Sequence, residues 1–355
     1  MIKQTAKIIL LLTIFNSAFF ACSTDDANTK KQETTGTQIY VAGVNPVNSQ
    51  LSTAELWKNG VATNLSSSNE SGFAFSVFAS GDDVYTTGYE YNGTNNIAKV
   101  WKNGVATNLG DGTKSSVAYS IFVSGNDVHV AGFEEGSIGF NARVWKNGIA
   151  TDLSDGFQSS ANAVFVSGND VYAAGWQIPT STANNEFVAV VWKNGIATRL
   201  TDGTKYAGAT SVFVSGNDVY VGGFEYKDTQ NKMLIAKIWK NGVAIDLTDG
   251  TKDALVESVF IDGNDVYAVG MQNVGKLFQD AATIWKNGVA INLTDGSKYA
   301  RAHSVFVDGS DVYVAGVENN GTHDVAKVWK NGAVTNLSNG AGLARAHSVF
   351  VKKSN

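Results

Sequence analysis

The chain has 355 residues, of which 43% are hydrophobic, with 37 glycines, 2 prolines and 1 cysteine. Its 27 basic and 32 acidic side chains give a formal charge of -5. A mildly acidic chain without basic runs lacks the means to neutralise phosphates, which excludes nucleic acid as a partner. A single cysteine excludes an intrachain disulfide.

Residues 1–21 are predicted to be a secretory signal. Lys3 and Lys7 precede an apolar run that is too short to span a bilayer comfortably, and Ala21 is a small residue at the cleavage point. Cys22 follows directly. A cysteine at this junction resembles the lipobox of bacterial lipoproteins, although two phenylalanines replace the usual leucine and small residue. An ordinary signal peptide with a chance cysteine is the alternative.

The lipoprotein resemblance implies that Cys22 carries the lipid and that the mature protein has the membrane as a partner through its N-terminus. Residues 22–36 are polar and are predicted to be a flexible tether. The early acidic pair Asp25 and Asp26 resembles the surface-export signal of Bacteroidota-type lipoproteins. This implies an exported protein on the bacterial outer membrane or cell surface.

The four-residue sequence WKNG then recurs through the chain every 44 to 47 residues. Its tryptophans are Trp57, Trp101, Trp145, Trp192, Trp239, Trp285 and Trp329. A period in this range indicates stacked supersecondary units. We interpret these tryptophans as packing residues, since a binding platform would not recur in every unit. Trp176 lies outside the motif, and its role is left open.

Each unit is predicted to contain four short strands. In one unit they are residues 211–214, 219–223, 236–239 and 243–247. Gly-Asn and Asn-Gly pairs lie between them and supply the positive φ angles that tight hairpins need. Four antiparallel strands in a repeat of this length are typical of a β-propeller blade.

The ends of the array set the number of blades. The array begins with a second-strand sequence, residues 38–43, and ends with a first-strand sequence, residues 348–351. Each strand type therefore occurs seven times. We predict an all-β, seven-bladed propeller over residues 37–355, closed by pairing of the N- and C-terminal strands, with Tyr40 close to Phe350.

A unit such as residues 211–247 resembles a kelch repeat. The second strand that ends in glycine, the polar loop and the aromatic third strand correspond, but the double glycine is kept only at Gly222 and Gly223. The resemblance implies the propeller layout and carries over no kelch activity.

Four units carry a matched pair of opposite charges. A glutamate follows the second-strand glycine by two residues, and a base precedes the tryptophan by two. The pairs are Glu90 and Lys99, Glu134 and Arg143, Glu225 and Lys237, and Glu318 and Lys327. If the glycine faces the tryptophan across the hairpin, these residues form exposed cross-strand ion pairs that are structural.

Candidate ligand-binding residues lie where the repeats differ, in the segments that lead into the first strands. The residues before the first-strand serines (or Ala163) are Phe75, Tyr119, Asn162, Thr210, Glu257, His303 and His347. Arg301 and Arg345 precede the two histidines by two residues. Together with Tyr119, Glu257, His303 and His347 they could bind an anion or a glycan, or two histidines and a carboxylate could bind a metal. The alternative is that the similar sequences at residues 299–304 and 343–348 arose by recent duplication and are simply exposed to solvent. His129 and His323 carry no functional signal.

No nucleophile elbow, phosphate loop, zinc signature or dinucleotide motif is found, so no cofactor is predicted. The repeated Thr-Asp-Gly loops are interpreted as turns rather than calcium sites. We therefore expect a non-catalytic protein that binds a glycan or a protein through its variable loops. A glycan-processing enzyme with a site at the channel mouth, or a passive structural spacer, are the alternatives.

Overall fold

The computed structural model describes residues 36–48, 51–67, 70–154, 158–179, 186–230, 232–275 and 279–353. The chain divides into the units Met1–Thr35 and Gly36–Asn355. The expected signal sequence, Cys22 and all but the last residue of the expected tether lie outside the described residues. Among the residues that are described, no helix is long and apolar enough to cross a membrane.

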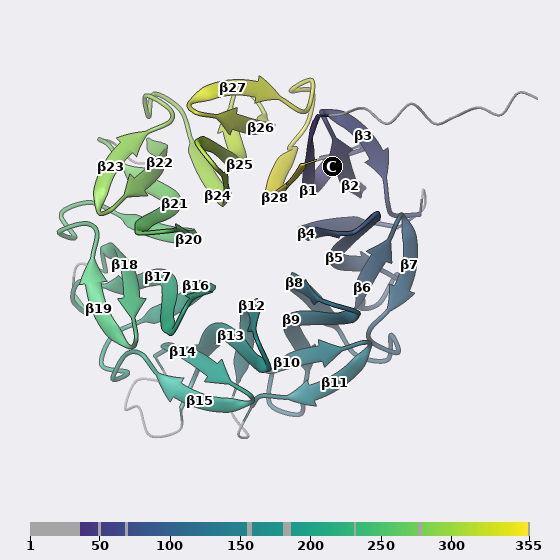
Figure 1. The fold of residues 1–355 in the computed structure, drawn as a ribbon, viewed down its shortest axis with the longest axis horizontal. Helices are drawn as coiled ribbons and strands as arrows, with labels where there is room; N and C mark the ends of the chain where they lie inside the picture. Colours follow the sequence, from purple (N-terminus) through teal and green to yellow (C-terminus); the bar gives the residue numbers. More distant parts are fainter. Residues whose placement is uncertain are drawn as a thin grey trace, which may run out of the picture. The chain divides into compact units, whose positions relative to one another are not determined.

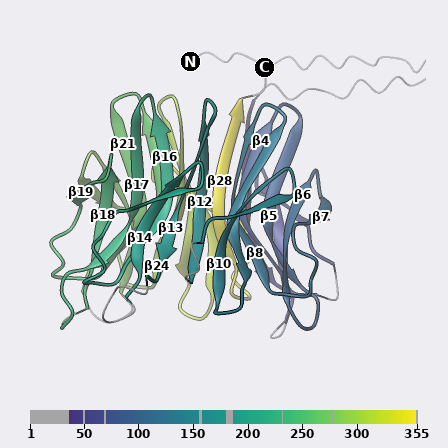
Figure 2. The ribbon, with the colours of Figure 1, turned by 90° about the horizontal axis from the view of Figure 1, so that it is seen from below.

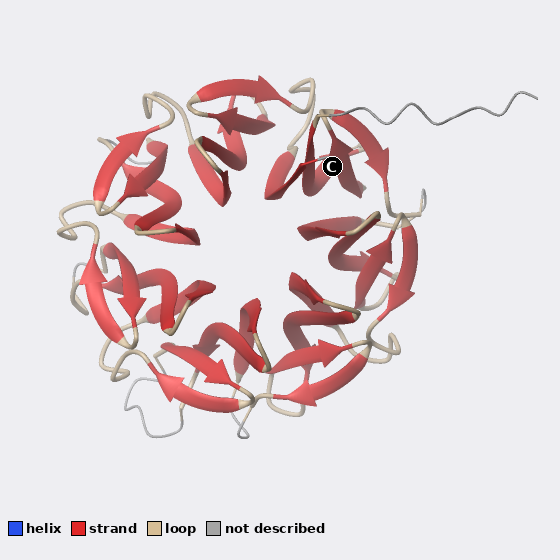
Figure 3. Ribbon diagram, viewed as in Figure 1, coloured by secondary structure: helices blue, strands red, loops and turns tan. Residues whose placement is uncertain are grey.

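Within these described ranges, 28 strands form seven four-stranded antiparallel sheets. The sheets are arranged as blades around a central axis (Figure 1), and strands and loops make up the drawn elements (Figure 3). In the side view the strands run roughly along this axis (Figure 2). The predicted seven-bladed propeller is confirmed.

Four kinds of strand succeed one another from the axis outwards. The innermost strands are β4 (Gly72–Ser80), β8 (Ser116–Ser124), β12 (Ser159–Ser167), β16 (Ala207–Ser215), β20 (Ala254–Asp262), β24 (Ala300–Asp308) and β28 (Arg345–Lys353). The second strands are β1 (Thr37–Pro46), β5 (Asp83–Tyr91), β9 (Asp127–Glu135), β13 (Asp170–Gln177), β17 (Asp218–Tyr226), β21 (Asp265–Asn273) and β25 (Asp311–Asn319).

The third strands are β2 (Ser52–Lys58), β6 (Asn96–Lys102), β10 (Phe140–Lys146), β14 (Val188–Lys193), β18 (Leu234–Lys240), β22 (Asp280–Lys286) and β26 (Asp324–Lys330). The outermost strands are β3 (Val61–Asn64), β7 (Val105–Asn108), β11 (Ile149–Asp152), β15 (Ile196–Arg199), β19 (Val243–Asp246), β23 (Val289–Asn292) and β27 (Ala333–Asn336).

The ring closes within one blade, whose strand order is β28-β1-β2-β3. The last strand of the chain supplies the innermost strand of the first blade, and Tyr40 is the Cα partner of Phe350, as predicted. Thr37 pairs with Lys353, so β1 begins at the end of the blade where β28 ends. This closure leaves no blade without an inner strand.

The blade β16–β19 shows the structural role of the WKNG motif. Trp239 is buried, while Asn241 and Gly242 form the turn with φ angles of 51° and 82°. The Asn241 side chain accepts a hydrogen bond from the Val219 amide at 2.8 Å and donates to Asp218 Oδ1 at 2.8 Å. Lys240 pairs with Asp218 Oδ2 at 2.8 Å. The motif therefore ties the two tight turns of a blade together.

The seven motif tryptophans are packing residues, as predicted, because each is 0–2% exposed. They pack between blades: Trp57 of β2 shares a cluster with Tyr313 and Val328 of the neighbouring blade. A buried tryptophan removes roughly 150–250 Å² from water. At about 25 cal/mol/Å² this is a gross gain of about 4–6 kcal/mol per seam.

All four predicted Glu–Lys and Glu–Arg pairs form. The predicted register is wrong by two residues, however, since Gly223 faces Lys237 and Trp239 faces Val221. Lys237 Nζ reaches Glu225 Oε2 diagonally at 3.0 Å. The side chains of Lys237 and Glu225 are only 9% and 15% exposed, so the expectation of exposed pairs is also wrong. Partial burial makes breaking such a pair costly.

Two layers of side chains line the centre of the wheel. One is a closed ring of phenylalanines with neighbouring ring centroids 4.7–5.1 Å apart, formed by Phe78, Phe122, Phe165, Phe213, Phe260, Phe306 and Phe350. The other is a layer of six serines and Ala163, each two residues before a phenylalanine of the ring. Ser211 Oγ, for example, accepts a hydrogen bond from the Val259 amide of the next blade at 3.1 Å.

Candidate functional site

The seven variable residues lie inside the innermost strands, not in the segments before them. Each innermost strand begins three or four residues earlier than the sequence pattern predicts; β16, for example, begins at Ala207 rather than Ser211. Between Ala209 and Ser211 the register shifts, so Thr210 is the extra residue of a β-bulge. A bulge re-aims a side chain. Here it turns one variable residue per blade towards the axis beside the serine layer.

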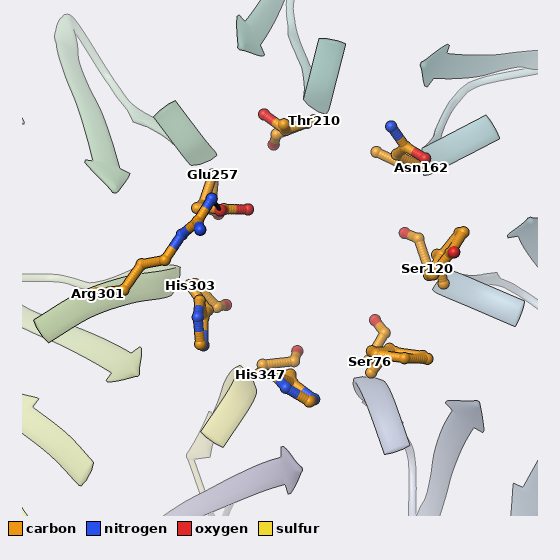
Figure 4. Close-up of a pocket in the computed structure, with 15 residues that line it drawn as sticks. Ser76, Ser120, Asn162, Thr210, Glu257, Arg301, His303 and His347 are labelled. Carbon is orange, nitrogen blue, oxygen red and sulfur yellow. Dashed lines mark ion pairs between the residues drawn. The ribbon is translucent and has the colours of Figure 1, made fainter. Parts of the chain in front are cut away.

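These bulged residues surround a cavity of about 440 Å³ on the axis, at the end opposite the start of β1. Figure 4 shows the labelled side chains pointing into one central space from successive strands. Among the predicted site residues, Tyr119, Glu257, Arg301, His303 and His347 line the cavity. Phe75, Asn162, Thr210 and the serines join them. The volume is that of an ordinary small-molecule site.

Arg345 does not line this cavity within the described part of the chain. Its Nε and Nη2 atoms donate to Asp324 Oδ2 at 2.9 and 2.7 Å, and Asp324 is buried. The second arginine of the sequence hypothesis is therefore already engaged by a carboxylate. Asp324 is the first residue of β26 and Arg345 the first of β28, so this ion pair joins strands of two different blades, which the sequence pattern does not show.

Four consecutive blades contribute aromatic rings to the cavity. The ring centroids of Tyr119 and Phe75 are 5.2 Å apart, those of Phe75 and His347 are 5.2 Å apart, and those of His347 and His303 are 5.4 Å apart. Burial, followed by the nearby Tyr89, raises the pKa of Tyr119 to about 12. The aromatic arc is therefore uncharged on its tyrosine side at neutral pH.

Both histidines are held in one tautomer. His303 Nδ1 donates to the carbonyl of Ala346, and His347 Nδ1 donates to the carbonyl of Ala74, each at 2.9 Å. A neutral imidazole that donates through Nδ1 has its acceptor at Nε2. Burial is the main cause that lowers the pKa of both side chains, to about 3. Both rings are thus neutral acceptors at neutral pH.

The other three blades contribute a polar arc. Asn162 Nδ2 donates to the Ala209 carbonyl at 2.9 Å, and Thr210 Oγ1 donates to the Val256 carbonyl at 2.8 Å. Like the two histidines, each bulged side chain thereby bonds the carbonyl that precedes the next bulge. These bonds fix the side chains in place and staple neighbouring blades together.

Glu257 completes the polar arc and forms an ion pair with Arg301 (Figure 4). Desolvation is the largest single influence and acts to lower the pKa of Arg301, but the charges and hydrogen bonds of Glu257 and Tyr299 together outweigh it, so the pKa is raised overall. The guanidinium therefore stays charged and neutralised by the carboxylate. With neutral histidines beside it, the cavity has little net charge, which weakens the anion-pocket hypothesis.

The described residues contain no group of three or more His, Cys, Asp or Glu side chains that could hold a metal ion. The repeated Thr-Asp-Gly loops form side-chain turns. Asp249 Oδ1 accepts hydrogen bonds from the Thr251 amide at 2.9 Å and from its hydroxyl at 2.7 Å, and Gly250 has a φ of 68°. The carboxylate thus closes its own loop.

Two solved structures are similar to this fold. One is the β-propeller domain of the trilobed protease from Pyrococcus furiosus, described as having an open Velcro topology, with a TM-score of 0.50 and 10% identity over 86% of this chain and 95% of that one. The other is acylaminoacyl peptidase from Pyrococcus horikoshii, with a TM-score of 0.52 and 12% identity over 86% of this chain. This chain covers 51% of that peptidase.

No protein-family model matches the chain, and no curated protein matches it. At 10–12% identity the likeness to the two solved structures shows the fold alone. The chain is a β-propeller protein, and its kelch resemblance stays a prediction. Its function has to be argued from the cavity.

Proposed function

We propose that the propeller binds the end of a neutral glycan in the axial cavity. The observation that carries the proposal is the division of one cavity into an aromatic arc and a polar arc. Aromatic faces stack on the apolar faces of sugar rings, and amides, hydroxyls and neutral imidazoles exchange hydrogen bonds with sugar hydroxyls. Of the described residues that line the cavity, Arg301 is the one Lys or Arg, and its ion pair with Glu257 leaves it unavailable to an acidic ligand.

The cavity favours binding over hydrolysis. Glycosidases of the usual kind need two carboxyl groups on either side of the scissile bond. Of the described residues that line the cavity, Glu257 alone carries a carboxylate, and Arg301 neutralises it. The function that we propose is therefore non-catalytic glycan binding by the propeller.

We further propose that the chain is a lipoprotein anchored through Cys22, on the bacterial outer membrane or cell surface. The leader pattern motivates this proposal. The cavity lies at the end of the wheel opposite the start of β1, the strand that follows the expected tether in the sequence. In this proposal Cys22→Ser releases the protein from the membrane fraction, whereas retention of the variant on the membrane contradicts the anchor.

A glycan array followed by calorimetry tests the binding function. Removing one stacking face worth about 1 kcal/mol lowers affinity roughly five-fold. We expect this for Phe75→Ala and for Tyr119→Ala. Tyr91→Ala is the matched control, because Tyr91 is 41% exposed and does not line the cavity. If the folded protein retains no glycan, or if Phe75→Ala binds as well as the parent protein, the proposal fails and a passive spacer becomes the better hypothesis.

A further inference from the structure

A second, smaller cavity of about 230 Å³ lies between the blade β8–β11 and the blade β12–β15. Its walls are mainly apolar and include Val144, Leu153, Ala173 and Trp192, which are all at most 8% exposed. His129 also lines it, and Lys146 and Asn194 lie on its exposed side. The cavity is separate from the axial site, since the two share no lining residue.

The cavity exists because this seam departs from the packing rule of the wheel. In the other six blades a tyrosine occupies the position of His129 and packs against the tryptophan of the next blade. These tyrosine–tryptophan pairs are Tyr40 and Trp101, Tyr85 and Trp145, Tyr172 and Trp239, Tyr220 and Trp285, Tyr267 and Trp329, and Tyr313 and Trp57. The smaller imidazole of His129 leaves part of that space open beside Trp192.

The facing blade does not fill the gap. Ala173 stands where four other blades have valine, namely Val41, Val130, Val221 and Val314. One other blade also has alanine here, Ala268, but its seam has a tyrosine, Tyr220, and an isoleucine, Ile238, in the same cluster. Of the seven seams, only this one combines a histidine in place of the tyrosine, His129, with an alanine in place of the valine, Ala173. Two small side chains at one contact leave a void that neighbours cannot close in a densely packed interior.

Two polar side chains at this seam, Lys146 and His129, have fewer contacts than their counterparts in the other blades. In six blades the motif lysine lies over the tyrosine ring, with its Nζ atom 5.0–5.5 Å from the centroid. Lys146 keeps its ion pair with Asp127 at 2.7 Å but has a histidine in place of that ring. His129 is 3% exposed, and its Nδ1 atom has no hydrogen-bond partner among the described residues.

We infer that this seam is a binding site for a small monocyclic aromatic molecule. An apolar cavity of about 150 Å³ is enough for benzene, so the space here admits one ring with a small substituent. The ring would lie against Trp192 and His129, and Lys146 would supply the cation that covers a ring in the other blades. A phenol fits best, because its hydroxyl both donates and accepts and can reach the polar mouth of the cavity.

The probe is 4-methylphenol, which carries the ring and hydroxyl of a tyrosine side chain. Binding to the full chain is followed by the rise in Tm with ligand concentration and by the indole N–H signal of Trp192. We expect saturable binding to the parent protein. His129→Tyr and Ala173→Val restore residues that other seams use, so both should fold, and each should weaken binding tenfold or more. His323→Tyr makes the same change on an outer loop and should bind like the parent protein.

Cyclohexanol, a saturated ring of similar size, separates an aromatic site from a general apolar void. We expect it to bind at least five-fold more weakly than 4-methylphenol. Equal affinity for the two probes overturns the aromatic assignment. Absence of saturable binding, or His129→Tyr binding as tightly as the parent protein, overturns the site itself. Glycan binding in the axial cavity is independent of each of these outcomes.

Discussion

Joining the two ends of the wheel by a disulfide puts the closure of the ring to a direct test. Gln38 of β1 and Lys352 of β28 are Cα partners in an antiparallel pair. Cα atoms of such partners are about 4.5–5.5 Å apart, which falls in the range that a disulfide spans. We therefore propose cysteines at both positions in a background with Cys22→Ser, so that the new thiols can react only with each other.

The size of the effect follows from the length of chain that the bond encloses. For a loop of roughly 310 residues, the chain-entropy relation gives about 5–6 kcal/mol of stabilisation. Engineered disulfides generally deliver less, so we expect about 2–4 kcal/mol. Lys352 gives up a 3.7 Å contact with the exposed Asp82 and a hydrogen bond to the Gly81 carbonyl. Gln38 gives up an exposed hydrogen bond that it accepts from Asn59 Nδ2, so the losses are all at the surface and small.

Non-reducing electrophoresis and titration of free thiols report whether the bond forms, and thermal unfolding with and without reductant reports its effect. The control joins Lys352→Cys with Asp218→Cys, which occupies the position of Gln38 in the blade β16–β19. This pair should remain reduced, because Asp218 belongs to a different blade. Failure of the Gln38–Lys352 pair to oxidise, or oxidation that lowers Tm, would refute the closed ring and with it the axial cavity.

Three further predictions concern the blades. Lys237→Val should lower the free energy of unfolding by about 3 kcal/mol, because it leaves the half-buried Glu225 carboxylate without its partner. Adding Glu225→Gln reproduces the Gln177 and Val190 pair of another blade and should restore most of the lost stability, as measured by urea unfolding. Ala163→Ser should raise the free energy of unfolding by about 0.5–1.5 kcal/mol, because in the six other blades a serine hydroxyl at this position accepts a hydrogen bond from a backbone amide of the next blade. An unchanged urea midpoint would contradict this prediction. The pKa of His303 and His347 is lowered from 6.5 to about 3, so between these pH values the unfolded chain binds protons that the folded chain does not. Stability should therefore fall as the pH is lowered from 6.5 to about 3, by at most about 1.4 kcal/mol per pH unit per histidine. The double variant His303→Gln/His347→Gln should flatten this slope.

The blades could be predicted because their information is local and repeated. Asn241 and Gly242 need the φ angles of a tight hairpin whatever surrounds them, and the pattern recurs in every unit. The closure could be predicted because the strand types at the two ends of the array complement each other. The pairing of Glu225 with Lys237 was visible as a correlation between blades, although its register and burial were not.

The bulges were missed because they add one residue without changing the repeat length. In β20 the buried alternation runs through Ala254 and Val256 and then resumes at Val259 and Ile261. This one-residue change of phase is the signal that could have located Glu257 inside a strand. The capture of Arg345 by Asp324 had no such signal, because the two residues come together only through tertiary packing.

The rim of the wheel has a consequence for how copies of the protein meet. Every blade ends in an outer strand of four residues, which exposes a strand edge to solvent. Six of these strands begin with a valine or isoleucine that is 67–76% exposed. Each of these residues faces the lysine of its own motif across the turn, as Val105 faces Lys102. Short length and a charged neighbour discourage edge-to-edge pairing. Two or three more apolar residues on each outer strand would turn a self-contained wheel into a tile that polymerises side by side.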